Sequence, residues 1–286
     1  YNIKVITWVQ DLWPDVLHST GHIKNKKILN IIEKIVNYIY KKNDMLLVQS
    51  SEFYNIISEK INHNNIHHLP NPGNLKYLEK MYSFENINLL ENNFKIKNSF
   101  SVVYAGNIGK VQSLETLVKS CVYLDKYKSI KVFIVGDGSE FNNIKKLANK
   151  LNLKNLFFFD YVKEEDLINL LSSAKVLYLS LINDNILNST IPSKFQNYLA
   201  CAKPIVASIS GETKKIISNS SCGLTCEPEN EKELADTIIK ISKISNTKLN
   251  IMGKNGLKYF LNYYHPNVIN QKLVSHINNL IADNEQ

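Results

Sequence analysis

One stretch of the sequence, residues 99–124, restricts the fold more than any other. An apolar run at 100–105 predicts a buried strand, and it ends in the glycine loop Gly106-Asn107-Ile108-Gly109. Apolar residues then recur at helical spacing through residue 124. A strand, a glycine turn and a helix predict a unit of a doubly wound sheet, in which backbone amides and a helix N-terminus face a phosphate. The glycines would let the main chain approach such a ligand, although turn geometry alone can require the same spacing.

The chain after this stretch repeats the alternation of strand and helix. Strands are predicted at 130–135, 156–160, 176–180 and 204–208, and helices at 142–151, 164–173, 193–201, 231–244, 247–264 and 267–282. The strands are almost continuously apolar, which is typical of a parallel sheet covered by helices on both faces. We therefore predict the α/β class with a doubly wound parallel sheet.

The first part of the chain has the same character but is shorter. Strands are predicted at 3–10 and 44–50, and helices at 24–42 and 52–60. His63, His67 and His68 fall in what we interpret as a polar loop, without the spacing of metal ligands. Residues 74–98 contain no clear strand, which indicates a domain boundary. The predicted division is a first domain at 1–75, a linker at 76–98, a second domain at 99–265 and a C-terminal helix at 266–286.

Charge and cysteine content exclude several classes of function. The net charge is +8, but every basic residue is Lys and Arg is absent. Because sequence-specific DNA readout relies on the bidentate Arg side chain, we do not expect nucleic acid as a partner. The four cysteines have neither zinc-ligand nor disulfide-framework spacing. No run is apolar enough to cross a bilayer, so we expect a cytoplasmic protein with inert thiols.

The predicted helix at 24–42 combines an isoleucine stripe with many lysines. Ile28, Ile32, Ile35 and Ile39 mark one face, and lysines crowd the rest. A basic amphipathic helix of this kind can lie on an anionic membrane, here peripherally on the inner face of the plasma membrane. The sequence favours the simpler alternative, in which the isoleucines are buried in the domain and the lysines are solvated.

Four loops follow strands of the second predicted domain, at 106–109, 136–140, 161–163 and 183–194. In a parallel sheet all four emerge at the carboxyl edge, where α/β proteins bind ligands. They bring backbone amides, Asp137, Glu140, the hydroxyls of Ser189, Thr190 and Ser193, and Lys194 at a helix start whose dipole adds positive charge. This set suits a nucleotide diphosphate. The simpler alternative makes Ser193 a helix N-cap and Lys194 a solvated first-turn residue.

A smaller polar group follows the first predicted strand, in Gln10-Asp11-Leu12-Trp13-Pro14. Asp11 stands just past the strand end, where it could contact a ligand. It could equally cap the following turn, while Trp13 packs against the protein. The sequence does not decide between these two interpretations.

Several motifs, in this order and spacing, carry a family resemblance. They are Gly106-Asn-Ile-Gly109, Val135-Gly-Asp-Gly138, Pro192-Ser-Lys194, Tyr198-Leu-Ala200, Lys203-Pro204-Ile-Val206, Gly223-Leu224 and Pro228, preceded by Gln10-Asp-Leu-Trp-Pro14, Val48-Gln-Ser50 and Leu69-Pro-Asn71. Over nearly its whole length the chain resembles the GT4 group of GT-B glycosyltransferases, most closely the bacterial fucosamine-type transferases of O-antigen and capsule synthesis. The resemblance implies two facing Rossmann-like domains, the first incomplete, and a last helix that crosses back to it. It also implies that about a hundred residues of the acceptor-side domain precede Tyr1.

Two departures from the family pattern concern charge. Members usually place Arg and Lys five residues apart in the first donor loop, where this chain has Asn107 and Gln112. Lys110 or Lys194 would then supply the positive charge.

The other departures concern carboxylates and a histidine. The usual pair of glutamates falls on Ser189 and Asn197, and Asn197 would hydrogen-bond a ribose hydroxyl more weakly than a carboxylate does. The usual histidine of the acceptor domain falls on Gln10, which leaves Asp11 as the nearest ionisable group.

The resemblance implies a reaction and a set of roles. A sugar, an N-acetylated hexosamine, would move with retention from a UDP-sugar to a glycan or lipid-linked acceptor, without a cofactor or a protein-bound metal. Preorganised positive groups would stabilise the leaving diphosphate. The expected catalytic residues are Asp11, toward the acceptor hydroxyl, and Lys194. The expected nucleotide-binding residues are Gly106, Asn107, Gly109, Lys110, Gly136, Asp137, Gly138, Val162, Ser189, Thr190, Ile191, Ser193 and Asn197.

Two other interpretations stay open. A UDP-sugar 2-epimerase-like isomerase has the same architecture, but it would need carboxylates and histidines in the cleft, of which the donor loops offer few. The second alternative is a chain that binds the nucleotide without turnover. Binding and product measurements with UDP-sugars, with and without an acceptor, distinguish the three.

Overall fold

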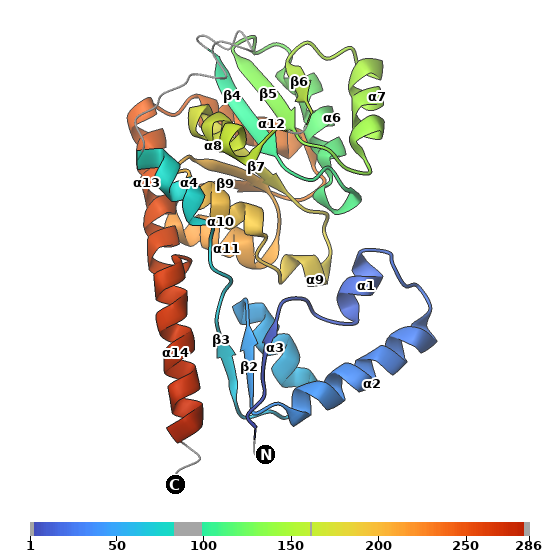
Figure 1. Ribbon diagram of the computed structural model, residues 1–286. Helices are drawn as coiled ribbons and strands as arrows, with labels where there is room; N and C mark the ends of the chain where they lie inside the picture. The colour runs from blue at the N-terminus through green and yellow to red at the C-terminus, as the bar shows by residue number, and fades with distance from the viewer. Residues whose placement is uncertain (1–2, 83–98, 161, 283–286) are drawn as a thin grey trace.

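The computed structural model describes residues 3–82, 99–160 and 162–282. In these residues the chain forms two parallel sheets, one of three strands and one of six (Figure 1). The smaller sheet comes first in the sequence, and the C-terminal helices run alongside both. The predicted α/β class is confirmed.

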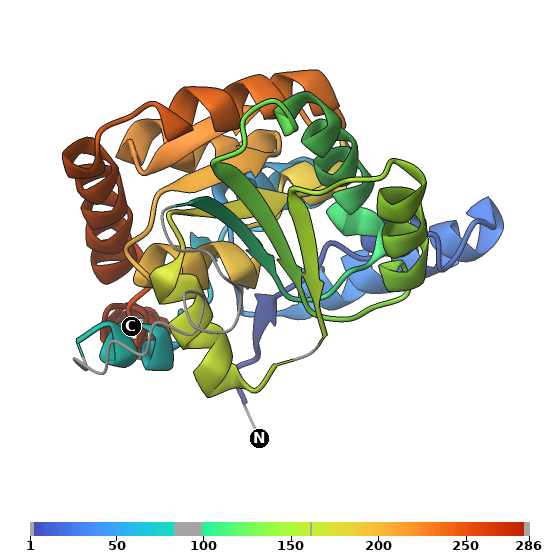
Figure 2. The ribbon, with the colours of Figure 1, turned by 90° about the horizontal axis from the view of Figure 1, so that it is seen from above.

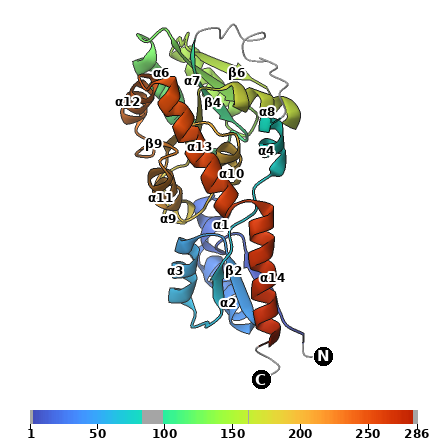
Figure 3. The same cartoon turned by 90° about the vertical axis from the view of Figure 1, so that its left-hand side faces the viewer.

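The smaller sheet has the order β1 (Ile6–Val9), β2 (Met45–Val48), β3 (Ile66–His68). Its connecting helices are α1 (Asp15–Ser19), α2 (Lys26–Lys42) and α3 (Ser51–Lys60). Alternate residues of β2 point to opposite faces, as strand geometry requires. Leu46 and Val48 pack against α3, whereas Met45 and Leu47 pack against α14 (Pro266–Ala282). Figure 3 shows α14 running along this sheet after α13 (Asn246–Tyr263) has covered the larger domain.

The larger sheet is entirely parallel, with the spatial order β6-β5-β4-β7-β8-β9. Its strands are β4 (Phe100–Ala105), β5 (Ile130–Val135), β6 (Leu156–Phe159), β7 (Val176–Ser180), β8 (Ile205–Ser208) and β9 (Gly223–Cys226). Counted from β4, this is the order 3-2-1-4-5-6 of dinucleotide-binding folds. The direction of winding reverses between β4 and β7, so the topological switch point lies there.

Helices cover both faces of the larger sheet (Figure 2). The clusters around α6 (Leu114–Leu124), α7 (Phe141–Lys150) and α12 (Glu231–Ser242) include Val102 and Tyr104 of β4. Val103 and Ala105 join the opposite cluster, with α8 (Glu164–Ser173), α10 (Ser193–Ala200), α11 (Gly211–Ser220) and α13. This alternation confirms the predicted doubly wound sheet.

Several short elements differ from the sequence-based prediction. His67 and His68 lie in β3 rather than in a polar loop, because three residues are too few to show an alternating pattern. The predicted linker at 76–98 begins inside α4 (Leu75–Tyr82), whose Tyr77 and Leu78 are buried in the larger domain's core. Residues 83–98 of that linker lie outside the described part of the chain. Short elements α1, α9 (Asn185–Asn188) and β9 were also not predicted.

Three hydrogen bonds and one ion pair between described residues join the two domains. The pairs are Ser50 Oγ to the Ser189 carbonyl at 2.7 Å, Ser51 Oγ to Glu212 Oε1 at 2.8 Å, Gln196 Nε2 to the Asn71 carbonyl at 2.9 Å, and Lys215 Nζ to Glu52 Oε1. Among the helices that the structure describes, none has the length and apolar character to cross a bilayer.

Candidate functional site

The loops at the switch point come together at the carboxyl ends of β4 and β7. The first carries Gly106–Gly109, and the second leads through α9 to the start of α10. Lys194 of α10 reaches back to the first loop: an ideal Cβ on Gly106 would lie 2.9 Å from Lys194 Cε and 3.0 Å from its Nζ. The predicted meeting of these two loops at one edge is therefore confirmed. A crevice at the switch point is where such sheets bind ligands.

The Lys194 ammonium lies on an aromatic ring instead of beside a carboxylate. Its Nζ is 3.6 Å from the ring centroid of Tyr104, at the end of β4. The described residues provide no ion-pair partner for it. The side chain keeps partial exposure, but burial of the ammonium lowers the pKa of Lys194 from 10.5 to about 7. A cation without a counter-ion at this edge is suited to bind an anion.

Glycines of the first two loops are required because the loops pack on each other. Gly106, Gly136 and Gly138 have φ of +129°, +130° and +158°. An ideal Cβ on Gly136 would overlap the Gly106 carbonyl oxygen, and one on Gly138 would overlap that of Ile108. Gly136 and Gly138 therefore make room for the neighbouring loop, and their expected contacts with a nucleotide stay predictions. Gly106 differs, since it faces Lys194.

Most amides of the glycine loop already have acceptors inside the protein. Gly106 N donates to the Val135 carbonyl at 2.9 Å, Ile108 N to the Asp137 carbonyl at 2.8 Å, and Gly109 N to Gln112 Oε1 at 2.9 Å. The prediction that the 106–109 amides as a group hold a diphosphate is therefore wrong. The second loop is similar, because Gly138 N donates to Asp137 Oδ1 at 2.7 Å and Glu140 N to the Ile108 carbonyl at 2.9 Å.

The two positions that replace the family's Arg and Lys form a neutral brace. Asn107 Nδ2 donates to Gln112 Oε1 at 3.4 Å, and the Asn107 carbonyl accepts from the Tyr104 hydroxyl. Ser180 Oγ of β7 donates to the Gln112 carbonyl at 2.5 Å. The brace fixes the loop but provides no charge. Lys110 is exposed at the start of a short 3₁₀ turn, η1 (Lys110–Gln112).

Helix α10 begins without a side-chain cap. Its N-cap is Pro192, and Ser193 is an exposed first helical residue. The alternative in which Ser193 caps the helix is therefore wrong. The amides of Ile191, Ser193 and Lys194 donate to no acceptor within residues 3–82, 99–160 and 162–282. Unpaired amides, the positive end of the helix dipole and the Lys194 side chain therefore occur at one helix end.

The side chains of Ser189 and Thr190 hydrogen-bond the C-terminal end of α9. Both hydroxyls donate to the Ile186 carbonyl, at 2.6 and 3.2 Å. The Thr190 amide donates to the Leu187 carbonyl at 3.1 Å, so the prediction that this amide holds a phosphate is wrong. Ser189 is buried, and its carbonyl accepts from Ser50 of the first domain.

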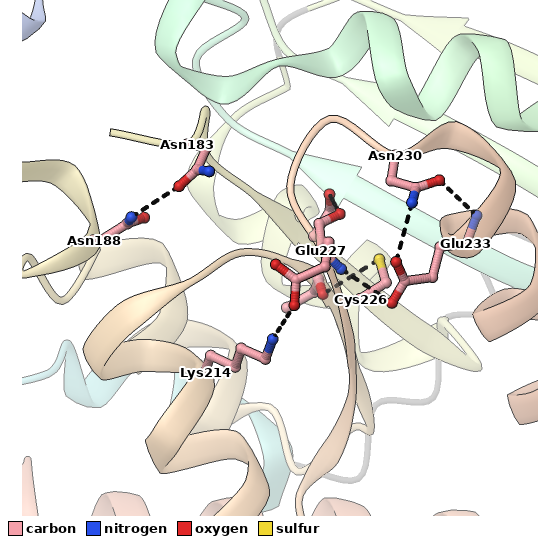
Figure 4. Close-up of polar contacts among 9 residues, drawn as sticks. Asn183, Asn188, Lys214, Cys226, Glu227, Asn230 and Glu233 are labelled. Carbon is pink, nitrogen blue, oxygen red and sulfur yellow. Dashed lines mark hydrogen bonds and ion pairs between the residues drawn. The ribbon is translucent and has the colours of Figure 1, made fainter. Parts of the chain in front are cut away.

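The start of the same loop is held by a hydrogen bond within the loop and by another from the segment that follows β9 (Figure 4). Asn188 Nδ2 donates to Asn183 Oδ1 at 3.0 Å, and Asn183 N donates to Glu229 Oε2 at 3.1 Å. The nearby Lys214–Glu227 ion pair, at 2.5 Å, joins α11 to the segment after β9. The contacts of Asn183 and Asn188 hold the loop that leads to the start of α10.

Two expected nucleotide contacts lie further from Lys194. Asn197, three residues along α10, lies near the Tyr77 hydroxyl of α4. Burial is the main cause that raises the pKa of Tyr77 to about 12. Val162 packs at the edge of the core cluster that contains α10. Their roles toward a nucleotide stay predictions.

Asp11 is exposed at the end of β1, and no described contact joins it to Lys194. Its carbonyl accepts from Trp13 N at 3.1 Å. Trp13 is 48% exposed and α1 has Pro14 as its N-cap, so the alternative with a capping Asp11 and a packed Trp13 is wrong. Burial, followed by the charges of Asp11 and Asp15, raises the pKa of Tyr40 to about 12. Asp11 therefore lies near α2, in the first domain.

A cavity of about 220 Å³ lies between the domains beside Asp15. Its lining residues come from α1, α2 and α9 and are mostly polar: Pro14, Asp15, His18, Ser19, Leu29, Asn30, Glu33 and Ile186. Lys60 Nζ pairs with Asp15 at 2.5 Å and with Glu33 at 3.5 Å.

Helix α2 does not bury its isoleucine stripe. No residue of α2 is buried, and five large apolar side chains are exposed: Ile28, Ile31, Ile35, Tyr38 and Ile39. Ile31 and Tyr38 are 60% and 64% exposed. The simpler sequence-based alternative, a buried stripe, is therefore wrong for this chain, because the helix contacts the domain mainly through its Leu29, Val36 and Tyr40 side.

In the described part of the chain, the cysteines form neither a disulfide nor a metal site. All four thiols are free and buried, and burial raises the pKa values of Cys121 and Cys201 to about 12. Within the described ranges, no three His, Cys, Asp or Glu side chains are grouped to hold a metal ion.

The fold is that of an α/β protein of GT-B architecture, with Lys194 and the uncapped start of α10 at the switch point of its larger sheet. The sequence profile of the family described as "Glycosyl transferases group 1" matches residues 86–259, more than half of the chain. The chain therefore belongs to this family of glycosyltransferases.

Individual relatives agree with this assignment. "Probable glycosyltransferase WbjE" of Pseudomonas aeruginosa is 24% identical over 86% of this chain and 62% of its own length. The chain thus spans about three fifths of the length of this curated relative. The Anabaena protein Alr3699/HepE, solved in complex with UDP, superposes with a TM-score of 0.80 at 13% identity, over 96% of this chain and 72% of its own. A glycosyltransferase of Rickettsia africae gives 0.78 at 19% identity, over 98% and 78%.

Sequence reasoning missed three parts of this site. They are the Tyr104 ring under the lysine, the uncapped start of α10 and the brace between Asn107 and Gln112. Pro192 directly before Ser-Lys was the available signal, because proline carries no side-chain oxygen that could cap the helix. The Tyr104 contact has no local signal, since it joins residues ninety positions apart.

Proposed function

We propose that this protein is a retaining glycosyltransferase of the GT4 group that transfers a sugar, an N-acetylated hexosamine, from a UDP-sugar to a glycan or lipid-linked glycan in cell-surface polysaccharide synthesis. One observation carries the proposal: the unpaired Lys194 ammonium lies against Gly106 at the switch point. HepE was solved with UDP and with UDP-glucose. A Bacillus anthracis relative, 22% identical over 58% of this chain, is named N-acetyl-alpha-D-glucosaminyl L-malate synthase, which supports an N-acetylhexosamine donor.

The chemistry requires stabilisation of the departing UDP. Negative charge grows on the β-phosphate as the glycosidic bond breaks, and fixed positive groups lower that barrier most. Lys194 would bind the diphosphate together with the amides of Ile191, Ser193 and Lys194, which have no acceptor in the described structure. Asn197 would bind the ribose, and the main chain of Val162 the base. No metal or cofactor is part of this proposal.

The acceptor would approach from the first domain. Asp11 is exposed at the carboxyl end of β1 and would orient the acceptor hydroxyl. The polar cavity lined by Asp15, His18 and Glu33 would accommodate part of a glycan.

Helix α2 would bring this domain to an anionic membrane that carries a lipid-linked acceptor. Its exposed apolar arc is flanked by Lys27, Lys34 and Lys41, spaced seven residues apart, and this is complementary to an acidic lipid surface. We expect sedimentation with vesicles of phosphatidylglycerol but not phosphatidylcholine, and loss of that binding in the Ile31→Asp/Ile35→Asp variant. Unchanged sedimentation of this variant would contradict membrane binding by α2, and would favour a protein segment as the cover of this face.

Calorimetry with UDP and UDP-sugars tests the nucleotide site. Lys194→Ala should weaken UDP binding about 30-fold, as expected when a charged hydrogen bond worth about 2 kcal/mol is lost. Lys203→Ala is the matched control, because burial also lowers the pKa of Lys203, yet Lys203 precedes β8 at the opposite edge of the sheet. Equal effects of the two substitutions, or the absence of UDP binding, would defeat the proposal.

A product assay separates the remaining alternatives. Transfer that requires an acceptor supports the glycosyltransferase. A changed sugar without an acceptor supports a 2-epimerase-like isomerase. Binding without any product supports a chain that holds the nucleotide but does not turn it over.

A further inference from the structure

Tyr104 contacts both parts of the candidate nucleotide site. It is fully buried near the end of β4. Its ring lies 3.6 Å below the Lys194 ammonium, measured from Nζ to the ring centroid. Its hydroxyl donates to the Asn107 carbonyl in the glycine loop. One side chain therefore links the site's cation to the loop that faces it.

A ring under this lysine has a different effect from a carboxylate. A carboxylate would neutralise the ammonium and compete with an incoming phosphate. An aromatic face attracts the ammonium through its quadrupole and leaves the net charge unchanged. The other groups close to Tyr104 are also uncharged: Tyr178, 6.4 Å away between ring centroids, and Tyr198, whose hydroxyl is bound to Ala105. Among the described residues, no carboxylate therefore competes with a phosphate for the Lys194 ammonium.

We propose that Tyr104 is a positioning residue for the nucleotide. Its ring holds the Lys194 ammonium over the glycine loop, and its hydroxyl fixes that loop through Asn107, so that a diphosphate meets a placed and unpaired cation. The inference rests on the proposed function and deepens it. In this inference the neutral side chain of Tyr104 places the Lys194 ammonium, at a site where Asn107 and Gln112 contribute no charge.

Three substitutions separate the parts of this role. Tyr104→Phe keeps the ring and removes the hydroxyl, and we expect a two- to threefold loss of UDP affinity. Tyr104→Leu removes the ring, and we expect about a tenfold loss, in the range of a desolvated cation–π contact. Tyr178→Leu is the matched control, because Tyr178 is buried in the same cluster and lies beside Tyr104. It should lower the melting temperature as much as Tyr104→Leu but leave UDP affinity unchanged.

A second measurement does not depend on UDP. Carbon–proton NMR of the lysine ε-methylene groups should show one signal with a larger ring-current shift than the others, assigned to Lys194 by its absence in Lys194→Ala. The other lysines near aromatic rings lie 5.4–5.9 Å from the ring centroids, against 3.6 Å for Lys194. The shift should persist in Tyr104→Phe and Tyr178→Leu and disappear in Tyr104→Leu. Equal UDP affinity in wild type and Tyr104→Leu, or no shifted signal in wild type, would overturn the inference. A wild-type protein that binds no UDP would instead defeat the proposed function itself.

Discussion

The glycine loop after β4 and the start of α10 meet at one edge of the larger sheet, but they are built in opposite ways. In the loop, the amides of Gly106, Ile108 and Gly109 already have protein acceptors. At the start of α10, the N-cap is a proline and Lys194 has no counter-ion among the described residues. The loop therefore acts as a scaffold, whereas the helix start keeps unpaired amides and a lysine that can bind a ligand.

The largest expected effect concerns the scaffold. Gly136→Ala places a methyl group on the Gly106 carbonyl at φ +130°, and we expect a loss of about 3 kcal/mol or more in the free energy of unfolding. Gly109→Ala should cost less than about 1 kcal/mol, because its Cβ would meet only the ends of the Gln112 and Asn107 side chains. Urea denaturation measures both. Similar losses would show that the two loops are not packed as rigidly as described.

The next expected effect is a pH dependence of stability and of UDP binding caused by Lys194, at the start of α10. Burial lowers the pKa of Lys194 from 10.5 in the unfolded chain to about 7 in the folded protein. The unfolded state thus binds more protons between these values, so this lysine makes stability rise with pH over that window. UDP binding should show the opposite trend, because a diphosphate favours the charged ammonium.

UDP affinity should therefore fall as pH rises above about 7, by up to about tenfold per pH unit, with proton uptake on binding. Calorimetry in buffers of different ionisation enthalpy, between pH 7 and 9, measures both quantities. In Lys194→Ala the profile should be flat over this range. A wild-type protein without proton uptake would show that Lys194 stays charged, or stays away from the nucleotide.

The sequence was most informative where a pattern is repeated and local. Near-continuous apolar strands alternating with amphipathic helices predicted the parallel sheet, and sheet geometry then brought Gly106 and Lys194 to one edge. The individual donors were harder to predict. Whether an amide such as that of Ile108 is free depends on where a second loop places its carbonyl, and this is decided by packing between distant segments.

The same reasoning explains the errors outside the site. α2 has the periodicity of a helix that buries isoleucines, but periodicity does not say what lies opposite the stripe. β3 and β9 are too short to show a pattern of their own, and they form because neighbouring strands offer unpaired backbone groups. α4 lacks a strand pattern and was therefore predicted as linker, yet its Tyr77 is buried against the larger domain.

A smaller effect is expected from the neutral brace. Gln112→Ala removes the acceptor of the Gly109 amide and of Asn107 Nδ2, which should cost about 1 kcal/mol in the free energy of unfolding. UDP affinity should fall no more than about threefold, because Lys194 keeps its ring contact. Calorimetry and denaturation test the two values together. A loss of UDP affinity as large as that of Lys194→Ala would mean that the scaffold itself takes part in binding.

The smallest effect distinguishes an uncapped helix from a capped one. Ser193→Ala should change the free energy of unfolding by less than about 0.5 kcal/mol, since Pro192 is the N-cap of α10. Asn230→Ala is the control: Asn230 caps α12 by accepting from Glu233 N at 3.1 Å, and its loss should cost about 1 kcal/mol. If both substitutions cost the same, the Ser193 hydroxyl caps α10 in solution. The first amides of that helix would then be occupied like those of the glycine loop, and the contrast between the two elements would be lost.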